Sequence, residues 1–125
     1  MRVSLGSDVG AGTGYSLFKE GLQAYFMQRL RGADGAPLTS THLLYLATTA
    51  GAAALGLEGQ VGDLSAGKQF DALWLRPPAG SPLDIGLRHA DGPEEALARA
   101  FALGVSCDVA GVWVNGALVK PDKMT

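Results

Sequence analysis

The sequence predicts an α/β fold, on three observations along its 125 residues. A short apolar run near the N-terminus stops at an aspartate and several glycines, as a buried strand does at its end. Two stretches with helical spacing of apolar residues follow. The second half changes to turns and short β-type runs and ends in an Asn-Gly hairpin signal. We therefore expect strand, helix, helix and then a mostly β half, at a length that suits one domain.

The N-terminal half is expected to hold one strand and two helices. Val3 to Leu5 is typical of a strand that is buried on both faces. A helix is predicted over residues 16–31, with Ser16 as N-cap, because large apolar residues recur at every fourth position. These residues are Phe18, Leu22, Phe26 and Leu30. A second helix is predicted from residue 40 or 41 to 55, with one stripe of apolar and small residues: Leu43, Leu46, Ala47, Ala50, Ala53 and Ala54.

The C-terminal half is expected to hold short strands and one helix. Residues 70–75 form a predicted strand that is stopped by two prolines, and residues 83–89 are predicted as another short strand. A helix is expected from about residue 93 to 104, because a proline and two glutamates stand in its first turn. Residues 112–114 and 117–119 flank Asn-Gly, which predicts a hairpin.

The composition narrows the class of protein. Hydrophobic residues make up 47%, enough for a core, and the net charge is −2 with scattered basic residues. This charge pattern predicts neither nucleic acid nor a membrane surface as a partner. The single Cys107 excludes an internal disulfide and a CxxC metal or redox motif. With no leader-like N-terminus and no long apolar run, we expect a cytoplasmic protein.

The glycine-rich stretch 6–14 does not match a nucleotide-binding loop. Gly10 and Gly12 supply the first two glycines of a dinucleotide fingerprint, but Tyr15 stands where the third is needed. The GK[ST] of a Walker A loop is absent as well. We therefore expect no binding of NAD or ATP here.

Asp8, at the end of the first predicted strand, allows two interpretations. A carboxylate at the C-terminal end of a parallel strand is where α/β barrels place catalytic residues. The alternative is an Asx-turn, in which the side chain only caps the glycine loop. Spacing alone leaves both open, because one aspartate makes no metal site and catalytic zinc needs about three protein ligands.

The other candidate residues do not complete an active site. His42 and His89 are 47 positions apart in sequence and form neither HxH nor HExxH. Cys107 has no neighbouring histidine or lysine to activate its thiol. The residues by themselves therefore contain no complete catalytic set.

Four segments together give the chain a family resemblance. They are Leu5 to Gly12, Ala47 to Leu57, Gly62 to Leu73 and Val112 to Gly116. In this order they resemble the C-terminal part of the metal-dependent amidohydrolase superfamily, and Gly67-Lys68-Gln69-Phe70-Asp71-Ala72-Leu73 resembles its guanine deaminase branch. The chlorohydrolase and cytosine deaminase branches are the alternatives within the superfamily.

The resemblance implies a fold. Enzymes of this kind combine a distorted (β/α)8 TIM-like barrel with a small β-sandwich built from both chain ends. Residues 1–60 would supply the last β/α unit of the barrel and the helix after it, with Val3 to Leu5 as the eighth strand. Residues 61–125 would supply the C-terminal part of the sandwich domain.

The resemblance also implies an activity. It implies a hydrolase that converts guanine to xanthine and ammonia in purine metabolism, with zinc as cofactor. Asp8 would be a zinc ligand and the catalytic group that passes a proton from the attacking water to the departing amine. Which residues read the purine is not implied by any motif in this chain.

The remaining ligands of that family are expected upstream of this chain. We therefore expect a C-terminal fragment that neither holds zinc nor deaminates guanine by itself, since a whole barrel needs roughly 250 residues. The alternative from a different class is a non-catalytic remnant module that self-associates as a homo-oligomer, because faces built to pack on a barrel are exposed in isolation.

Overall fold

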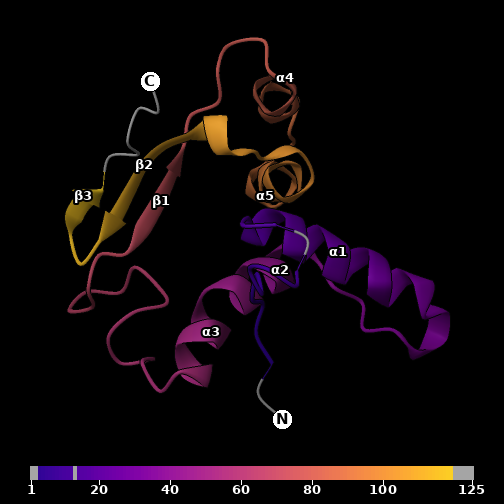
Figure 1. The fold of residues 1–125 in the computed structure, drawn as a ribbon. Coiled ribbons are helices and arrows are strands. Elements are labelled where there is room, and N and C mark those ends of the chain that lie inside the picture. Colours follow the sequence, from indigo (N-terminus) through magenta and orange to yellow (C-terminus); the bar gives the residue numbers. More distant parts are fainter. Residues whose placement is uncertain (1–2, 13, 120–125) are drawn as a thin grey trace.

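A computed structural model describes residues 3–12 and 14–119 (Figure 1). The helices are α1 (Leu17–Leu30), α2 (Ser40–Ala47), α3 (Thr49–Ala54), α4 (Pro82–Arg88) and α5 (Pro93–Leu103), with two short 3-10 turns, η1 (Gly32–Asp34) and η2 (Ser106–Asp108). The strands are β1 (Ala72–Leu75), β2 (Val109–Val114) and β3 (Ala117–Val119). The helices gather on one side, and the sheet lies beside them (Figure 1).

The helical part is organised around α5. This helix packs against α1, α2 and α4. Phe101 of α5 is buried, and its ring meets Phe18 of α1 edge to face at 5.5 Å between centroids. Gly21 of α1 faces the same ring, because a Cβ at this position would lie 2.6 Å from an edge atom of Phe101. A glycine at 21 is therefore what lets α1 approach α5 this closely.

The sheet is an antiparallel meander in the order β1-β2-β3. Asn115 and Gly116 both have positive φ in the β2–β3 turn, so the hairpin predicted from Asn-Gly is confirmed. The turn is also tied to the chain before β1: Asn115 N donates to a carboxylate oxygen of Asp71 at 2.6 Å, and Gly116 N donates to the carbonyl of Phe70 at 2.9 Å.

Besides the hairpin, three of the predicted elements agree with the structure, with shifts of a few residues at the ends. The helix predicted over 16–31 is α1, with Ser16 at the N-cap position but without a side-chain capping bond. The helix predicted over 93–104 is α5, which begins at Pro93 and has Gly104 as its C-cap. The strand predicted over 70–75 is the shorter β1.

The strand predicted at Val3 to Leu5 is wrong for this chain. Residues 3–8 belong to no strand, and Leu5 N donates instead to the carbonyl of Leu46 in α2 at 3.0 Å. A strand needs a hydrogen-bonded neighbour, and the described three-stranded sheet is built from residues 72–119.

The strand predicted at 83–89 is also wrong, because this segment is α4. Ser81 caps it by accepting from the backbone N of Asp84, and Pro82 stands in the first turn. Ser, Pro and Asp at these positions are a helix start, which outweighs the short apolar run. The C-terminal half is therefore mixed rather than mostly β.

The second predicted helix is broken in two at Thr48. This residue has φ −127° and ψ −89°, and its hydroxyl donates to the carbonyl of Leu44 at 2.7 Å. A threonine hydroxyl bonded back to the preceding turn bends helices.

The predicted apolar stripe of α1 is packed only in its first half, because Phe26 is 53% and Leu30 80% exposed.

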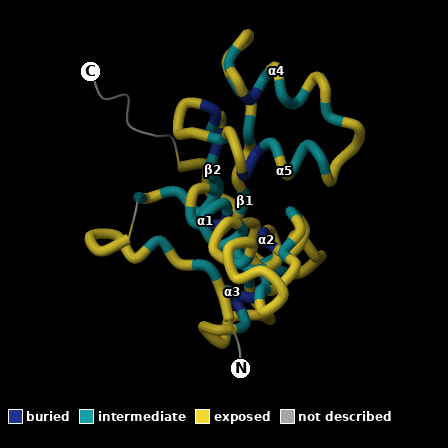
Figure 2. The backbone as a smooth tube through the Cα atoms, turned by 90° about the vertical axis from the view of Figure 1, so that its right-hand side faces the viewer, coloured by how far each residue is buried: buried dark blue, intermediate teal, exposed yellow. Residues whose placement is uncertain are grey.

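The core is small for the length of the chain. The buried hydrophobic residues are Leu43, Ala50, Ala52, Leu83, Ala100 and Phe101. The accessible surface is 8734 Å², against about 6,300 Å² for a compact monomer of this mass. Figure 2 shows long exposed stretches between the few buried positions. The fold thus leaves much apolar surface uncovered.

The contact between Gly21 and Phe101 makes a prediction about stability. Alanine normally stabilises a helix interior relative to glycine by about 0.5–1 kcal/mol, but at 21 the new methyl group overlaps the Phe101 ring. Overpacking costs about 1–3 kcal/mol, so we expect Gly21→Ala to lower the free energy of unfolding in urea.

The matched control is Gly51→Ala in α3, where a Cβ meets nothing within 4 Å. There we expect a gain of up to about 1 kcal/mol. A stabilising effect of Gly21→Ala equal to that of Gly51→Ala would contradict the close packing of α1 on α5.

Candidate functional site

Asp8 lies at the first turn of the chain and presents an exposed side chain. It is one of two non-glycine residues in the described part with positive φ, at 45°. Its main-chain carbonyl accepts hydrogen bonds from Ala11 N at 3.0 Å and from Gly12 N at 2.5 Å. Short polar residues such as Asp tolerate this left-handed conformation better than other side chains do.

The turn is closed by the backbone of Asp8 and not by its carboxylate. No hydrogen bond joins the carboxylate to another residue of segments 3–12 and 14–119. This geometry speaks against the Asx-turn interpretation, in which the side chain is the capping group. The carboxylate is therefore available to a group from outside the described chain.

The two histidines and the cysteine form no metal-binding group with Asp8 in the described part of the chain. His42 is part of a reciprocal cap of α2: its Nδ1 accepts from Thr39 N at 3.2 Å, and its own backbone N donates to Thr39 Oγ1 at 3.3 Å. His89 is the exposed C-cap residue of α4. Cys107 is free and exposed in η2. The two histidines thus act at helix ends.

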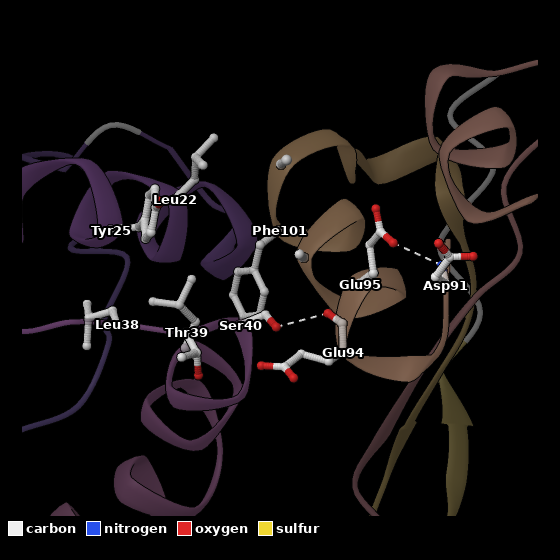
Figure 3. Close-up of a pocket in the computed structure, with 12 residues that line it drawn as sticks. Leu22, Tyr25, Leu38, Thr39, Ser40, Asp91, Glu94, Glu95 and Phe101 are labelled. Carbon is white, nitrogen blue, oxygen red and sulfur yellow. Dashed lines mark hydrogen bonds between the residues drawn. The ribbon is translucent and has the colours of Figure 1, made fainter. Parts of the chain in front are cut away.

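A groove of about 620 Å³ opens between α1, α2 and α5, and Asp8 does not line it (Figure 3). Leu22, Tyr25 and Phe101 form part of its apolar wall. Ser40 Oγ donates to the carbonyl of Glu94 across it at 3.0 Å. The groove also contains three acidic residues, Asp91, Glu94 and Glu95. The sequence pattern indicates only a helix start at these positions and does not predict a groove.

The pKa of Glu95 in this groove is held below its usual value, chiefly by the backbone N–H of Asp91, which donates to the carboxylate at 2.9 Å. Arg99, one turn further along α5, adds an ion pair. These contacts fix the start of α5. They do not direct the carboxylate of Glu95 toward a ligand.

Comparison with models of known protein families shows to which family this chain belongs. The model of the amidohydrolase family matches residues 1–119. The chain belongs to the amidohydrolase family.

The relatives of this amidohydrolase chain confirm the predicted resemblance to guanine deaminases. It is 64% identical over 119 residues to a probable guanine deaminase of Deinococcus radiodurans, covering 95% of this chain and 27% of the relative. It is 32% identical over 127 residues to the guanine deaminase of Homo sapiens, covering 97% and 28%. The chain thus spans about a quarter of the length of these relatives.

Solved structures agree with the fold. The E. coli guanine deaminase superposes with a TM-score of 0.86 at 28% identity, over 95% of this chain and 27% of that one. A guanine deaminase from C. acetobutylicum with guanine bound in its active site superposes with a TM-score of 0.75 at 29% identity, over 94% and 27%.

The described residues of this amidohydrolase do not by themselves fit a catalytic zinc ion. No group of three or more His, Cys, Asp or Glu side chains that could hold a metal occurs among residues 3–12 and 14–119. A catalytic zinc site needs about three protein ligands and an open position. Asp8 offers one carboxylate oxygen donor, a ligand type that zinc accepts, and needs partners from elsewhere.

The motif from Gly62 to Asp71, which carried part of the resemblance, links the helices to the sheet of this amidohydrolase. Thr49 of α3 donates through Oγ1 to the carbonyl of Gly62 at 3.0 Å. Inside the motif, Lys68 Nζ donates to Asp63 at 2.6 Å, and Ser65 N donates to the same carboxylate at 2.9 Å. Lys68 is 18% exposed and Asp63 37%. The ion pair thus closes the turn before β1.

The carboxyl group of Asp63 should titrate far below an ordinary aspartate. The hydrogen bond from Lys68, followed by those from Ser65, lowers its pKa from 3.8 to about 2. Because the folded pKa is the lower one, this contribution to stability is present above about pH 4 and is lost as the pH falls toward 2. Carboxyl NMR shifts measured against pH give this pKa directly.

Lys68→Met should raise the pKa of Asp63 toward 3.8, because it removes the hydrogen bond that lowers this pKa most, together with the Coulombic attraction of the Lys68 ammonium. Lys19→Met, which changes the net charge equally but lies in α1, is the control. An Asp63 pKa that stays near 2 in Lys68→Met would show that Lys68 does not hold this carboxylate.

Proposed function

We propose that this chain is the C-terminal part of a zinc-dependent guanine deaminase, which hydrolyses guanine to xanthine and ammonia in purine metabolism. The observation that carries the proposal is the superposition with guanine deaminases over 94–95% of the chain, one of them with guanine in its active site. The relative at 64% identity supports the same branch.

Within this proposal, residues 1–60 supply the last β/α unit of a (β/α)8 barrel, and residues 61–125 supply the C-terminal part of a small β-sandwich. The unpaired segment at Val3 to Leu5 is then the eighth strand, whose neighbours come from the rest of the barrel. The half-exposed Leu73 and Trp74 of β1 support further packing on the sheet. We also propose that the protein is cytoplasmic, which agrees with the free thiol of Cys107.

Asp8 is the residue of this chain that we assign to the chemistry. When bound, zinc makes a hydroxide-like nucleophile available near neutral pH. Asp8 would hold the metal through its carboxylate, and this carboxylate would take a proton from the water as the water oxygen bonds to the carbon that carries the amino group. It would return that proton to the amino nitrogen as the C–N bond breaks, so that ammonia leaves, the oxygen stays on the ring carbon and the carboxylate is regenerated. Its exposed side chain, which makes no hydrogen bond to another described residue, supports this role.

Two alternatives have observations of their own. Another deaminase branch is favoured by a 34% identity over 128 residues to a 5-methylthioadenosine/S-adenosylhomocysteine deaminase of Teredinibacter turnerae. A non-catalytic module that self-associates is favoured by the exposed apolar side chains of the isolated chain. The experiments below separate both from guanine deamination.

A chimera tests the function directly. This chain replaces the matching residues of the D. radiodurans relative, and guanine-to-xanthine conversion is followed by ultraviolet absorbance. We expect turnover, and we expect Asp8→Asn to lower kcat by about 100-fold or more, since a positioned proton carrier contributes about that much.

Asp34→Asn in η1 removes the same charge from another exposed aspartate and should leave kcat unchanged. A chimera that deaminates the nucleoside-type substrate and not guanine would favour the alternative branch. Full turnover by Asp8→Asn would contradict the assignment of Asp8.

The 125-residue chain alone should be inactive. Because its described residues supply one candidate ligand, we expect no bound zinc at stoichiometric level after dialysis, measured by elemental analysis, and no xanthine from guanine. Measurable guanine conversion by the purified chain would refute the proposal that the remaining ligands lie outside it.

A further inference from the structure

The turn after Asp8 closes on a position that has no room for a side chain. A Cβ at residue 12 would lie 2.1 Å from the carbonyl oxygen of Ser7 and 3.0 Å from that of Asp8. Gly12 N also donates to the Asp8 carbonyl at 2.5 Å, so the backbone of residue 12 is held against this peptide unit. The contact is between main-chain atoms, which cannot rotate away as the end of a flexible side chain can.

The other glycines of the stretch are not crowded in this way. A Cβ at Gly6 or Gly10 would meet nothing within 4 Å, and one at Gly14 would make an ordinary contact of 3.6 Å with the side chain of Lys19. Gly10 has φ +106°, which explains a glycine there by conformation alone. The close approach is therefore specific to Gly12.

The two crowded carbonyls are the ones that orient Asp8. The Ser7 carbonyl belongs to the peptide unit before the Asp8 Cα, and the Asp8 carbonyl belongs to the unit after it. Displacing them rotates φ and ψ of Asp8 and swings its Cα–Cβ bond. A Cβ at residue 12 would have to move the Ser7 carbonyl oxygen by more than about 1 Å, from 2.1 Å to the 3.4 Å at which ordinary contact begins.

We propose that Gly12 is a positioning residue for the Asp8 carboxylate: the missing side chain at 12 lets the turn hold Asp8 at φ +45°, with its side chain exposed. This inference rests on the role proposed above for Asp8. A misplacement of about 1 Å in a reacting group can cost about 100-fold in rate.

The test uses the chimera with Gly12→Ala and, as matched control, Gly6→Ala. We expect Gly12→Ala to lower kcat by about 100-fold while KM for guanine changes less than about threefold, because the proposal assigns to this turn the placement of the Asp8 carboxylate and no contact with guanine. Gly6→Ala should keep both constants. The melting temperature of each variant is measured alongside, since a loss caused by unfolding would lower the melting temperature and the concentration of active sites.

A folded Gly12→Ala chimera with kcat close to that of the unsubstituted chimera would overturn the positioning role and leave the proposed function intact. An inactive unsubstituted chimera, or full turnover by Asp8→Asn, would overturn the function itself and the positioning role with it.

If Gly12→Ala prevents folding of the chimera, the test is made by NMR on the isotope-labelled 125-residue chain. The coupling between the amide and α protons of Asp8, which reports its φ, is compared between the chain with Gly12→Ala and the unsubstituted chain. A changed coupling supports the positioning role, and an unchanged one contradicts it.

Discussion

The contact of Phe101 with Gly21 and Phe18 is the one on which the rest of the helical structure depends. This contact fixes α5 on α1, and α2 and α4 in turn pack against α5. In this chain α1 comes close to the ring because Gly21 has no side chain, and a Cβ there would lie 2.6 Å from the ring. The hydrogen bond between Leu5 and Leu46 then fastens the N-terminal segment, with Asp8 at its end, to α2.

The sheet lies beside the helices as a layer of its own (Figure 1). Thr49 of α3 donates to the carbonyl of Gly62 in the loop before β1, and Arg76 N, just after β1, donates to the carbonyl of Asp108 in η2. Large apolar side chains stay exposed in the sheet and in α1, among them Trp74, Leu118 and Leu30. Exposed apolar surface on this scale marks faces that pack on something else. It supports the proposal that this amidohydrolase chain works as part of a longer polypeptide.

The sequence predicted those elements whose signals are local. The Asn-Gly hairpin carries its own turn, the helix that begins at Pro93 carries a proline and two glutamates in its first turn, and the helix after Ser16 carries apolar residues at helical spacing. It failed where the outcome depends on partners: Val3 to Leu5 has the composition of a buried strand, but a strand forms only beside another strand. At 83–89 the prediction followed the short apolar run, whereas Ser81, Pro82 and Asp84 start a helix there.

For the site, the sequence identified Asp8 but could not choose between catalysis and a turn by spacing alone. The structure adds that the main-chain carbonyl of Asp8 closes the turn and that Gly12 is crowded against it. These facts depend on atomic distances and leave no periodic pattern in a sequence. The sequence does not distinguish the glycines at 10, 12 and 14. Of these three, only Gly12 lies at a position where a Cβ would overlap the backbone of residues 7 and 8.

The most direct test of the account is a crystal structure of the chimera with data collected at the zinc absorption edge. The account predicts an anomalous peak about 2.0–2.2 Å from a carboxylate oxygen of Asp8. A zinc peak at a site where Asp8 is not a ligand would contradict it.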